Sequence, residues 1–309
     1  MYITLRYITL LLCFHNCVCL GQKGKFLVPL KGEAGRDFFI DSYFDHDTMS
    51  SIRDVFCGKR TYDGHSGTDF CISGFKAMDK GVDVLAAANG RVVDIVDGNF
   101  DRSKQRNKHG RGNYVAILHE DGMITYYLHL KTKSICCSVG DSVVAAQKIA
   151  QVGSSGDSWN PHLHFEVKDM KRKSLDPFSG SCADDTSHYW ISQPKLNTNL
   201  TIIESGFVPY IPQLDSLQEG HNVTDTFELK HDSLVCFWAY LNGLNFHDKL
   251  QTKWMKRRVT YTTNTYLWRN ARCHEYYWSW IKMPSTKGVW HVEFSVNDVL
   301  LSTKKFYLK

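Results

Sequence analysis

The chain has 309 residues, a formal net charge of +5 and an aromatic content of 13%. This length is sufficient for two globular domains, each with its own hydrophobic core. The weak positive charge does not favour nucleic acid as a partner, and beyond the N-terminus no apolar run is long enough to predict a membrane span.

The first 21 residues have the features of a secretory signal. Arg6 is their only charge, residues 8–14 form a short apolar core, and the small residue Gly21 precedes the expected cleavage point. We therefore expect an exported protein, either secreted or held in the periplasm or cell envelope. Residues 22–50 are predicted to be a lead-in segment that packs on the domain that follows.

Cysteines are numerous for a chain of this length. In an exported protein they are expected to form disulfides, and an odd number leaves one unpaired. A Cys57–Cys71 bridge would brace the residues between them, and Cys236 could pair with Cys273, but connectivity does not follow from sequence alone. No pair has the Cys-x-x-Cys spacing of a cysteine zinc site. The seven cysteines that follow the predicted signal are Cys57, Cys71, Cys136, Cys137, Cys182, Cys236 and Cys273.

Residues 51–178 are predicted to form an antiparallel β domain. Helical periodicity is hard to find there, whereas apolar and β-branched runs such as 92–96 and 114–118 alternate with Gly, Asp and Asn turns. Turns at 97–99 and 120–122 indicate hairpins. The expected strands are 83–87, 90–97, 113–119, 123–130, 142–144, 148–152 and 162–168.

Three short stretches of this domain carry histidines and an aspartate. His162 and His164 lie two positions apart, so an extended strand would point both to one face. Such a pair suits a site where one imidazole binds a metal and the other acts on the group that the metal activates. Two half-buried structural histidines are an equally common outcome. Upstream, His65 and Asp69 lie four residues apart and His129 follows later; His65, Asp69 and one later histidine would give three zinc ligands and leave the fourth position for water.

In chain order, His-x-x-x-Asp at 65–69, Thr-x-Tyr-x-His-Leu at 125–130 and Pro-His-Leu-His-Phe-Glu-Val at 161–167 resemble the lysostaphin/LytM-type zinc metallopeptidases of family M23. The resemblance implies an open antiparallel sheet with one zinc ion in a groove, bound by His65, Asp69 and His164. It also implies that His129 is the general base and His162 stabilises the oxyanion, or the reverse.

Three further residues are expected to contact substrate. Tyr127 would share a strand face with His129, Asn113 matches a family position near the groove, and Trp159 would lie at the rim. Trp159 and Asn160 depart from the family, which usually has small residues and glycine there, and this departure puts substrate preference in doubt. A latency segment could also block the metal; its candidate side chains are Asp45, His46 and Asp47.

Residues 179–205 are polar and are predicted to be a linker, and residues 206–309 return to short strands. About 100 residues of this kind predict a second, smaller β-sandwich, of which the immunoglobulin fold is one form. Core packing explains its aromatic residues better than a carbohydrate or peptide surface does. The expected strands are 226–230, 234–242, 258–262, 276–281, 289–296 and 299–308.

The expected function is that of a secreted zinc metalloendopeptidase whose substrate, by family resemblance, is the peptide cross-links of peptidoglycan; glycine-rich proteins are a variant. One alternative is a non-catalytic zinc-containing binding or signalling protein on the same fold. Another is a cell-wall scaffold that docks a partner or the wall through the C-terminal domain. The presence of both His129 and His162 favours the enzyme.

Overall fold

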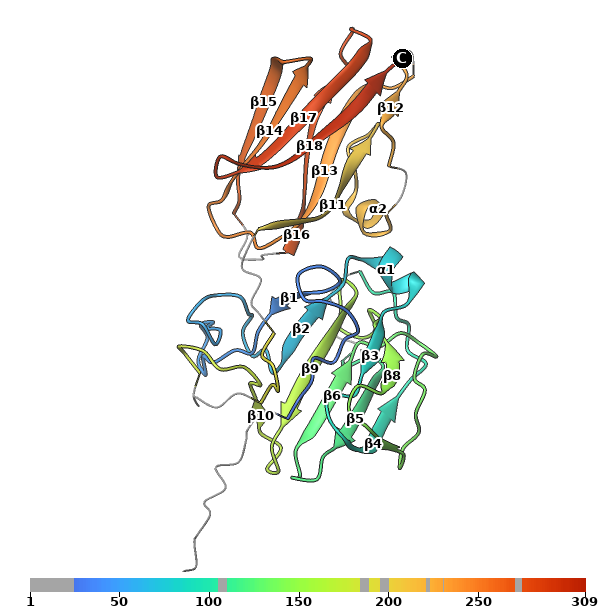
Figure 1. Ribbon diagram of the computed structural model, residues 1–309, viewed down its shortest axis with the longest axis vertical. Coiled ribbons are helices and arrows are strands. Elements are labelled where there is room, and N and C mark those ends of the chain that lie inside the picture. Colours follow the sequence, from blue (N-terminus) through green and yellow to red (C-terminus); the bar gives the residue numbers. More distant parts are fainter. Residues whose placement is uncertain are drawn as a thin grey trace, which may run out of the picture.

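The computed structural model describes residues 25–104, 110–183, 189–194, 200–220, 223–229, 231–269 and 274–309. The predicted signal, residues 1–21, lies outside them. Figure 1 shows two bodies stacked along the long axis, with β1 to β10 and α1 in one and β11 to β18 and α2 in the other. Within the described part of the chain, no helix has both the length and the hydropathy needed to cross a membrane.

The first body is built on an antiparallel eight-stranded sheet, in the order β1-β2-β9-β6-β5-β4-β7 with β10 paired to β9. A two-stranded sheet, β3 with β8, and one short helix, α1, accompany it. The bounds are β1 Phe39–Ser42, β2 Thr68–Cys71, α1 Phe75–Lys80, β3 Asp83–Leu85, β4 Gly90–Val96, β5 Tyr114–Leu118, β6 Ile124–Leu128, β7 Ser142–Val143, β8 Lys148–Gln151, β9 His162–Lys168 and β10 Ser174–Leu175.

Strand β9 lies at the centre of this sheet, hydrogen-bonded to β2 on one side and to β6 on the other. Leu163, Phe165 and Val167 point into the hydrophobic core of the domain. Because side chains alternate along a strand, His162 and His164 point to the opposite face. This face is also shielded from solvent, since both histidines are buried.

Segments on both sides of the predicted domain pack into its core. Phe26, from the expected lead-in, forms a β-bridge with Trp190, from the expected linker, and both side chains are fully buried against the same core. A disulfide joins Cys57 to Cys182 across 125 residues and ties the later segment to the domain. The structure therefore packs the described parts of both segments with the first sheet.

The predicted bridge between Cys57 and Cys71 is wrong. Cys57 pairs with Cys182, and Cys71 is buried on β2. Cys236 is also buried, and its expected partner Cys273 lies outside the described residues. Sequence proximity favoured Cys71 as the partner of Cys57, but Cys71 lies in a strand whose side chains are all buried within the sheet.

The second body is a β-sandwich, as predicted; an immunoglobulin-like topology stays a prediction. A three-stranded sheet, β11-β13-β16, faces a five-stranded sheet, β12-β18-β17-β14-β15, across one hydrophobic core. The bounds are β11 Thr201–Val208, α2 Leu214–Gln218, β12 Thr226–Phe227, β13 Leu234–Asn242, β14 Lys249–Lys256, β15 Val259–Leu267, β16 His274–Lys282, β17 Gly288–Val296 and β18 Val299–Leu308.

Strand β13 is buried on both faces, which explains its nearly continuous apolar sequence. Phe237 and Leu241 belong to the core between the two sheets. Trp238, Tyr240 and Cys236 point the other way and pack with Leu217 of α2. The outer face of β13 is thus covered rather than solvated, which matters for the site described below.

Candidate metal centre and neighbouring histidines

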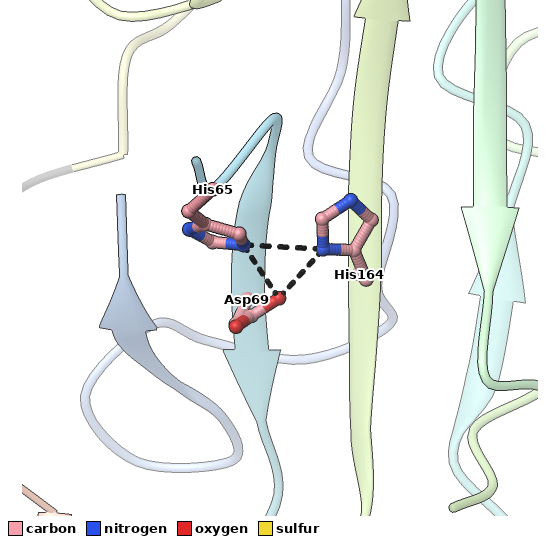
Figure 2. A group of neighbouring side chains, drawn as sticks. All are labelled: His65, Asp69 and His164. Atoms are coloured by element: carbon pink, nitrogen blue, oxygen red, sulfur yellow. Dashed lines mark hydrogen bonds and ion pairs between the residues drawn. The ribbon is translucent and has the colours of Figure 1, made fainter. Parts of the chain in front are cut away.

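Three side chains converge on one point of the first domain. His65 comes from the loop before β2, Asp69 from β2 and His164 from β9 (Figure 2). Asp69 and His164 are directly paired across the two strands, so antiparallel register places them on the same face. His65 Nε2 lies 3.2 Å from both Asp69 Oδ1 and His164 Nδ1, and the latter two atoms are 2.9 Å apart. These residues form a possible metal site.

The donor set fits a zinc ion. Tetrahedral coordination with bonds of about 2.0–2.1 Å separates neighbouring ligand atoms by about 3.3 Å, close to the observed spacings. His65 Nδ1 donates a hydrogen bond of 2.6 Å to the Tyr43 carbonyl, so Nε2 is the atom that neutral His65 would offer to a metal. Two imidazoles and one carboxylate leave one tetrahedral position without a protein ligand, as in catalytic zinc sites.

The carboxylate of this cluster is charged. Burial alone would raise the pKa of Asp69, but the neighbouring His65 and His162, together with hydrogen bonds from His164 and His65, hold its pKa well below the ordinary value. Burial likewise disfavours protonation of His65, yet the Asp69 charge outweighs it and raises the pKa of His65. A buried negative charge between imidazoles is an environment that favours a cation.

His129 and His162 lie beside this cluster. Their ring centroids are 4.7 Å apart, and His162 Nε2 is 3.7 Å from Asp69 Oδ1. His129 Nδ1 donates to the Ser155 carbonyl at 2.7 Å, and His162 Nδ1 donates to the Asn160 carbonyl at 2.8 Å. Since a carbonyl can only accept, the Nε2 atom of each neutral ring is left as a proton acceptor.

Burial favours the neutral form of both of these histidines. Burial, and then the charges that His162 and His164 would carry, lower the pKa of His129 well below its ordinary value. Burial also lowers the pKa of His162, although Asp69 opposes the shift. Neutral imidazoles with free Nε2 lone pairs can take up a proton, which is what a general base requires.

The backbone at His129 explains how this residue reaches the site. Tyr127 pairs directly with Phe165, whose ring faces the core, so regular alternation would also turn His129 into the core. Strand β6 ends at Leu128, and His129 adopts a left-handed φ of 63°. This break in the strand points the imidazole toward His162 and His164 instead.

The expected substrate contact by Tyr127 is therefore wrong. The Tyr127 side chain is fully buried in the core, where its hydroxyl accepts a hydrogen bond of 2.8 Å from the Ala87 amide. The physical reason is the left-handed residue that separates its strand face from that of His129.

Asn113 does not face an open groove either. It is fully buried, and its side-chain amide donates to the carbonyls of Asn99 and Leu130, both at 3.1 Å. Its backbone N–H donates to Ser155 Oγ at 2.9 Å. Asn113 thus braces the residues that flank His129 and its carbonyl partner Ser155, which makes it a positioning residue.

Trp159 is half-buried, and its carbonyl accepts a hydrogen bond of 3.2 Å from Gln218 Nε2 of α2 in the second domain. Sequence reasoning missed this contact, since nothing local in the chain indicates it.

The prediction of a latency segment that blocks the metal site finds no support in the geometry. Asp45 accepts from the Gly64 amide at 3.0 Å and His46 pairs with Asp176 at 2.9 Å. Of Asp45, His46 and Asp47, none belongs to the possible metal cluster found among the described residues.

An antiparallel β-sheet that presents this metal-ligand triad beside two neutral histidines defines the class: a candidate metal-dependent hydrolase domain. Residues 63–177 match the model of Peptidase family M23. This match confirms the resemblance to family M23 that the order of the motifs predicts.

The chain also resembles known proteins. It is 36% identical over 103 residues to Peptidoglycan DD-endopeptidase ShyA of Vibrio cholerae, covering 33% of this chain and 20% of that protein. It is 37% identical over 114 residues to Murein hydrolase activator NlpD of Escherichia coli, covering 37% of this chain and 25% of that protein. The catalytic domain of the antimicrobial peptidase lysostaphin from Staphylococcus simulans aligns with 26% identity and a TM-score of 0.29, covering 44% of this chain and 85% of that structure. The chain thus spans a quarter or less of the length of these two curated relatives.

Proposed function

We propose that this protein is a secreted zinc metalloendopeptidase that hydrolyses peptide bonds in the cross-links of peptidoglycan. The observation that carries the proposal is the meeting of five side chains. His65, Asp69 and His164 offer three ligand atoms, and His129 and His162 point toward them with unprotonated Nε2 atoms. The names of the relatives, a peptidoglycan endopeptidase among them, support this substrate class.

The chemistry can be derived from the residues. A zinc ion held by the triad would polarise the scissile carbonyl and lower the pKa of its water from about 15.7 toward about 7. His129 Nε2 then accepts the proton of the attacking water, and proton transfer of this kind contributes about 10²–10⁴-fold. To stabilise the developing oxyanion, His162 must donate from a protonated Nε2, and the charge of Asp69 favours that protonation. Because both Nδ1 atoms are bonded to carbonyls, either Nε2 can take the proton, and the ring that has taken it can pass it to the leaving amine.

A second candidate is a non-catalytic member on the same fold. The relative named Murein hydrolase activator supports it, because that name describes an activator rather than a peptidase. The complete set of two histidines beside the triad favours catalysis, since a protein that only binds zinc has no need for two further imidazoles aimed at the open position. If the protein is an enzyme, glycine-rich polypeptides are the alternative substrate. Docking to the cell wall through the sandwich stays a prediction.

The test is hydrolysis of purified peptidoglycan by the full chain, followed by release of new amino termini, with bound zinc measured on the same samples. His129→Ala is expected to keep zinc and to lower the rate by about 10²–10⁴-fold. The exposed His231→Ala serves as the matched control and is expected to behave as the wild type. A glycine-rich peptide in parallel separates the two substrate classes. Zinc binding by the wild type without cleavage of either substrate would contradict the enzyme and support the binding protein.

A further inference from the structure

The second domain contacts the loop that leads into β9. Figure 1 places α2 next to α1, at the end of the sandwich nearest the peptidase domain. Glu219, which follows α2, is bonded by Arg102 and by Lys104 Nζ at 2.8 Å. Gln218 Nε2 donates to the Trp159 carbonyl at 3.2 Å. Charged and neutral hydrogen bonds therefore anchor the sandwich beside residues 158–160.

A deeper contact comes from Tyr240 on β13. Its ring stacks on that of Tyr276, with centroids 4.0 Å apart, and its side chain is almost fully buried. The Asn160 side-chain amide forms a hydrogen bond with the Tyr240 hydroxyl and donates another, of 3.5 Å, to Cys71 Sγ on β2. Asn160 is itself buried, so its amide is fixed between the two domains.

The same asparagine holds a catalytic ring. Its main-chain carbonyl accepts the Nδ1–H of His162 at 2.8 Å and also a hydrogen bond of 2.9 Å from Ser158 Oγ. Ser158 Oγ lies 3.3 Å from His162 Nδ1 as well. The direction of the His162 ring is therefore set by the position of the Asn160 peptide, and that position is fixed through the Asn160 side chain by Tyr240.

We infer that the C-terminal sandwich is part of the active-site support, with Tyr240 as a positioning residue that orients His162 through Asn160. Gln218 reinforces the same loop through the Trp159 carbonyl. The sequence predicts only a docking role for the sandwich, whereas this geometry has the sandwich orient a side chain at the site of the other domain. The expected effect on kcat rests on the proposed peptidase function, but the effect of Tyr240 on the order of the loop that leads into β9 does not.

Hydrogen exchange tests the structural half of the inference in the full chain. Tyr240→Phe removes one hydroxyl and keeps the stacked ring, so amides in residues 155–164 are expected to exchange about fivefold faster, the effect of one lost buried hydrogen bond. Tyr277→Phe is the matched control, because its hydroxyl lies 3.0 Å from Thr252 Oγ1 inside the sandwich. It is expected to leave exchange in residues 155–164 unchanged. Wild-type exchange of these residues in Tyr240→Phe would overturn the inference.

Kinetics on the peptidoglycan substrate test the catalytic half. Tyr240→Phe is expected to lower kcat by about fivefold with KM and zinc content unchanged, whereas Tyr277→Phe keeps kcat. Asn160→Ala removes the link from the other side, so adding Tyr240→Phe to it should lower kcat no further. Additive effects, or a change in KM alone, would overturn the positioning role. If the wild type cleaves nothing, the proposed function fails, and the exchange experiment still decides whether the sandwich orders the loop.

Discussion

Gly67 lies in the loop between two metal ligands, and replacing it with alanine should weaken metal binding. A Cβ built there would lie 2.5 Å from the Phe165 carbonyl oxygen and 2.8 Å from His164 Nε2. Ordinary contacts begin near 3.4 Å, so the His164 ring would have to move by about 0.6 Å. The Phe165 carbonyl belongs to central strand β9 and cannot yield easily. The ring that supplies Nδ1 to the site is thus the part expected to move.

A displacement of this size is about a third of a zinc–nitrogen bond of about 2.0–2.1 Å. We expect Gly67→Ala to lower zinc affinity by about 10–100-fold, the range for lost support of a ligand. Overpacking should also lower the free energy of unfolding of the metal-free protein by about 1–3 kcal/mol.

Competition with a chromophoric chelator measures the affinity, and urea unfolding of metal-free samples measures the stability. Gly64→Ala is the control in the same loop. Its Cβ would meet nothing within 4 Å, but its φ of +74° strains an alanine. It should therefore lose stability and retain zinc affinity. Wild-type zinc affinity in folded Gly67→Ala would refute the reasoning that packing behind His164 fixes the ligand.

Two further predictions concern the links that hold the segments together. Replacing both Cys57 and Cys182 with serine removes a disulfide that has a sequence separation of 125 residues, and it should lower the free energy of unfolding by about 2–5 kcal/mol in urea titrations. The control Cys136→Ser changes an exposed cysteine and should leave the stability unchanged. Equal stability of the double variant and the wild type would contradict the prediction. Hydrogen bonds from Arg102 hold the pKa of Glu219 at about 2, below its ordinary value. The contribution of Glu219 to the free energy of unfolding is therefore complete above about pH 4.5 and is lost as the pH falls toward 2. Because the Arg102–Glu219 pair is partly solvated, we expect the free energy of unfolding to fall by only about 1 kcal/mol between pH 6 and pH 3. This fall should be absent in Glu219→Gln. If the stability of that variant depended on pH as the wild type does, Glu219 would be excluded as the cause.

The local features of this protein could be predicted from its sequence. Alternation around His162 and His164 identifies β9 and its two faces, because a strand repeats every two residues regardless of its surroundings. Turn residues indicated the hairpin between β5 and β6. The expected metal cluster of His65, Asp69 and His164 is found together in the structure, although its chemical role stays a proposal.

The errors arose where distant residues decide the outcome. Tyr127 was placed on the face of His129 because a regular strand was assumed, and one left-handed residue removes that relation. Cys57 was paired with the nearest suitable cysteine, whereas its partner lies 125 residues away. Phe26 and Trp190 appeared to lie outside the domain, since no local pattern shows that they meet in its core. Each error has the same cause: sequence patterns report periodicity, and long-range pairing depends on packing.

The loop at Trp159 and Asn160 shows how a local sequence feature and a long-range contact combine. The sequence shows a departure from the family at this position, and the departure alone suggests a change of substrate. In the structure, the Trp159 carbonyl and the Asn160 side chain are the groups that contact Gln218 and Tyr240 of the sandwich. Glycine at position 160 would have no side chain to offer Tyr240. The second domain thus accounts for the asparagine at 160 but not for the Trp159 side chain, because Trp159 contacts Gln218 through its main chain. The two domains are expected to act as one catalytic unit.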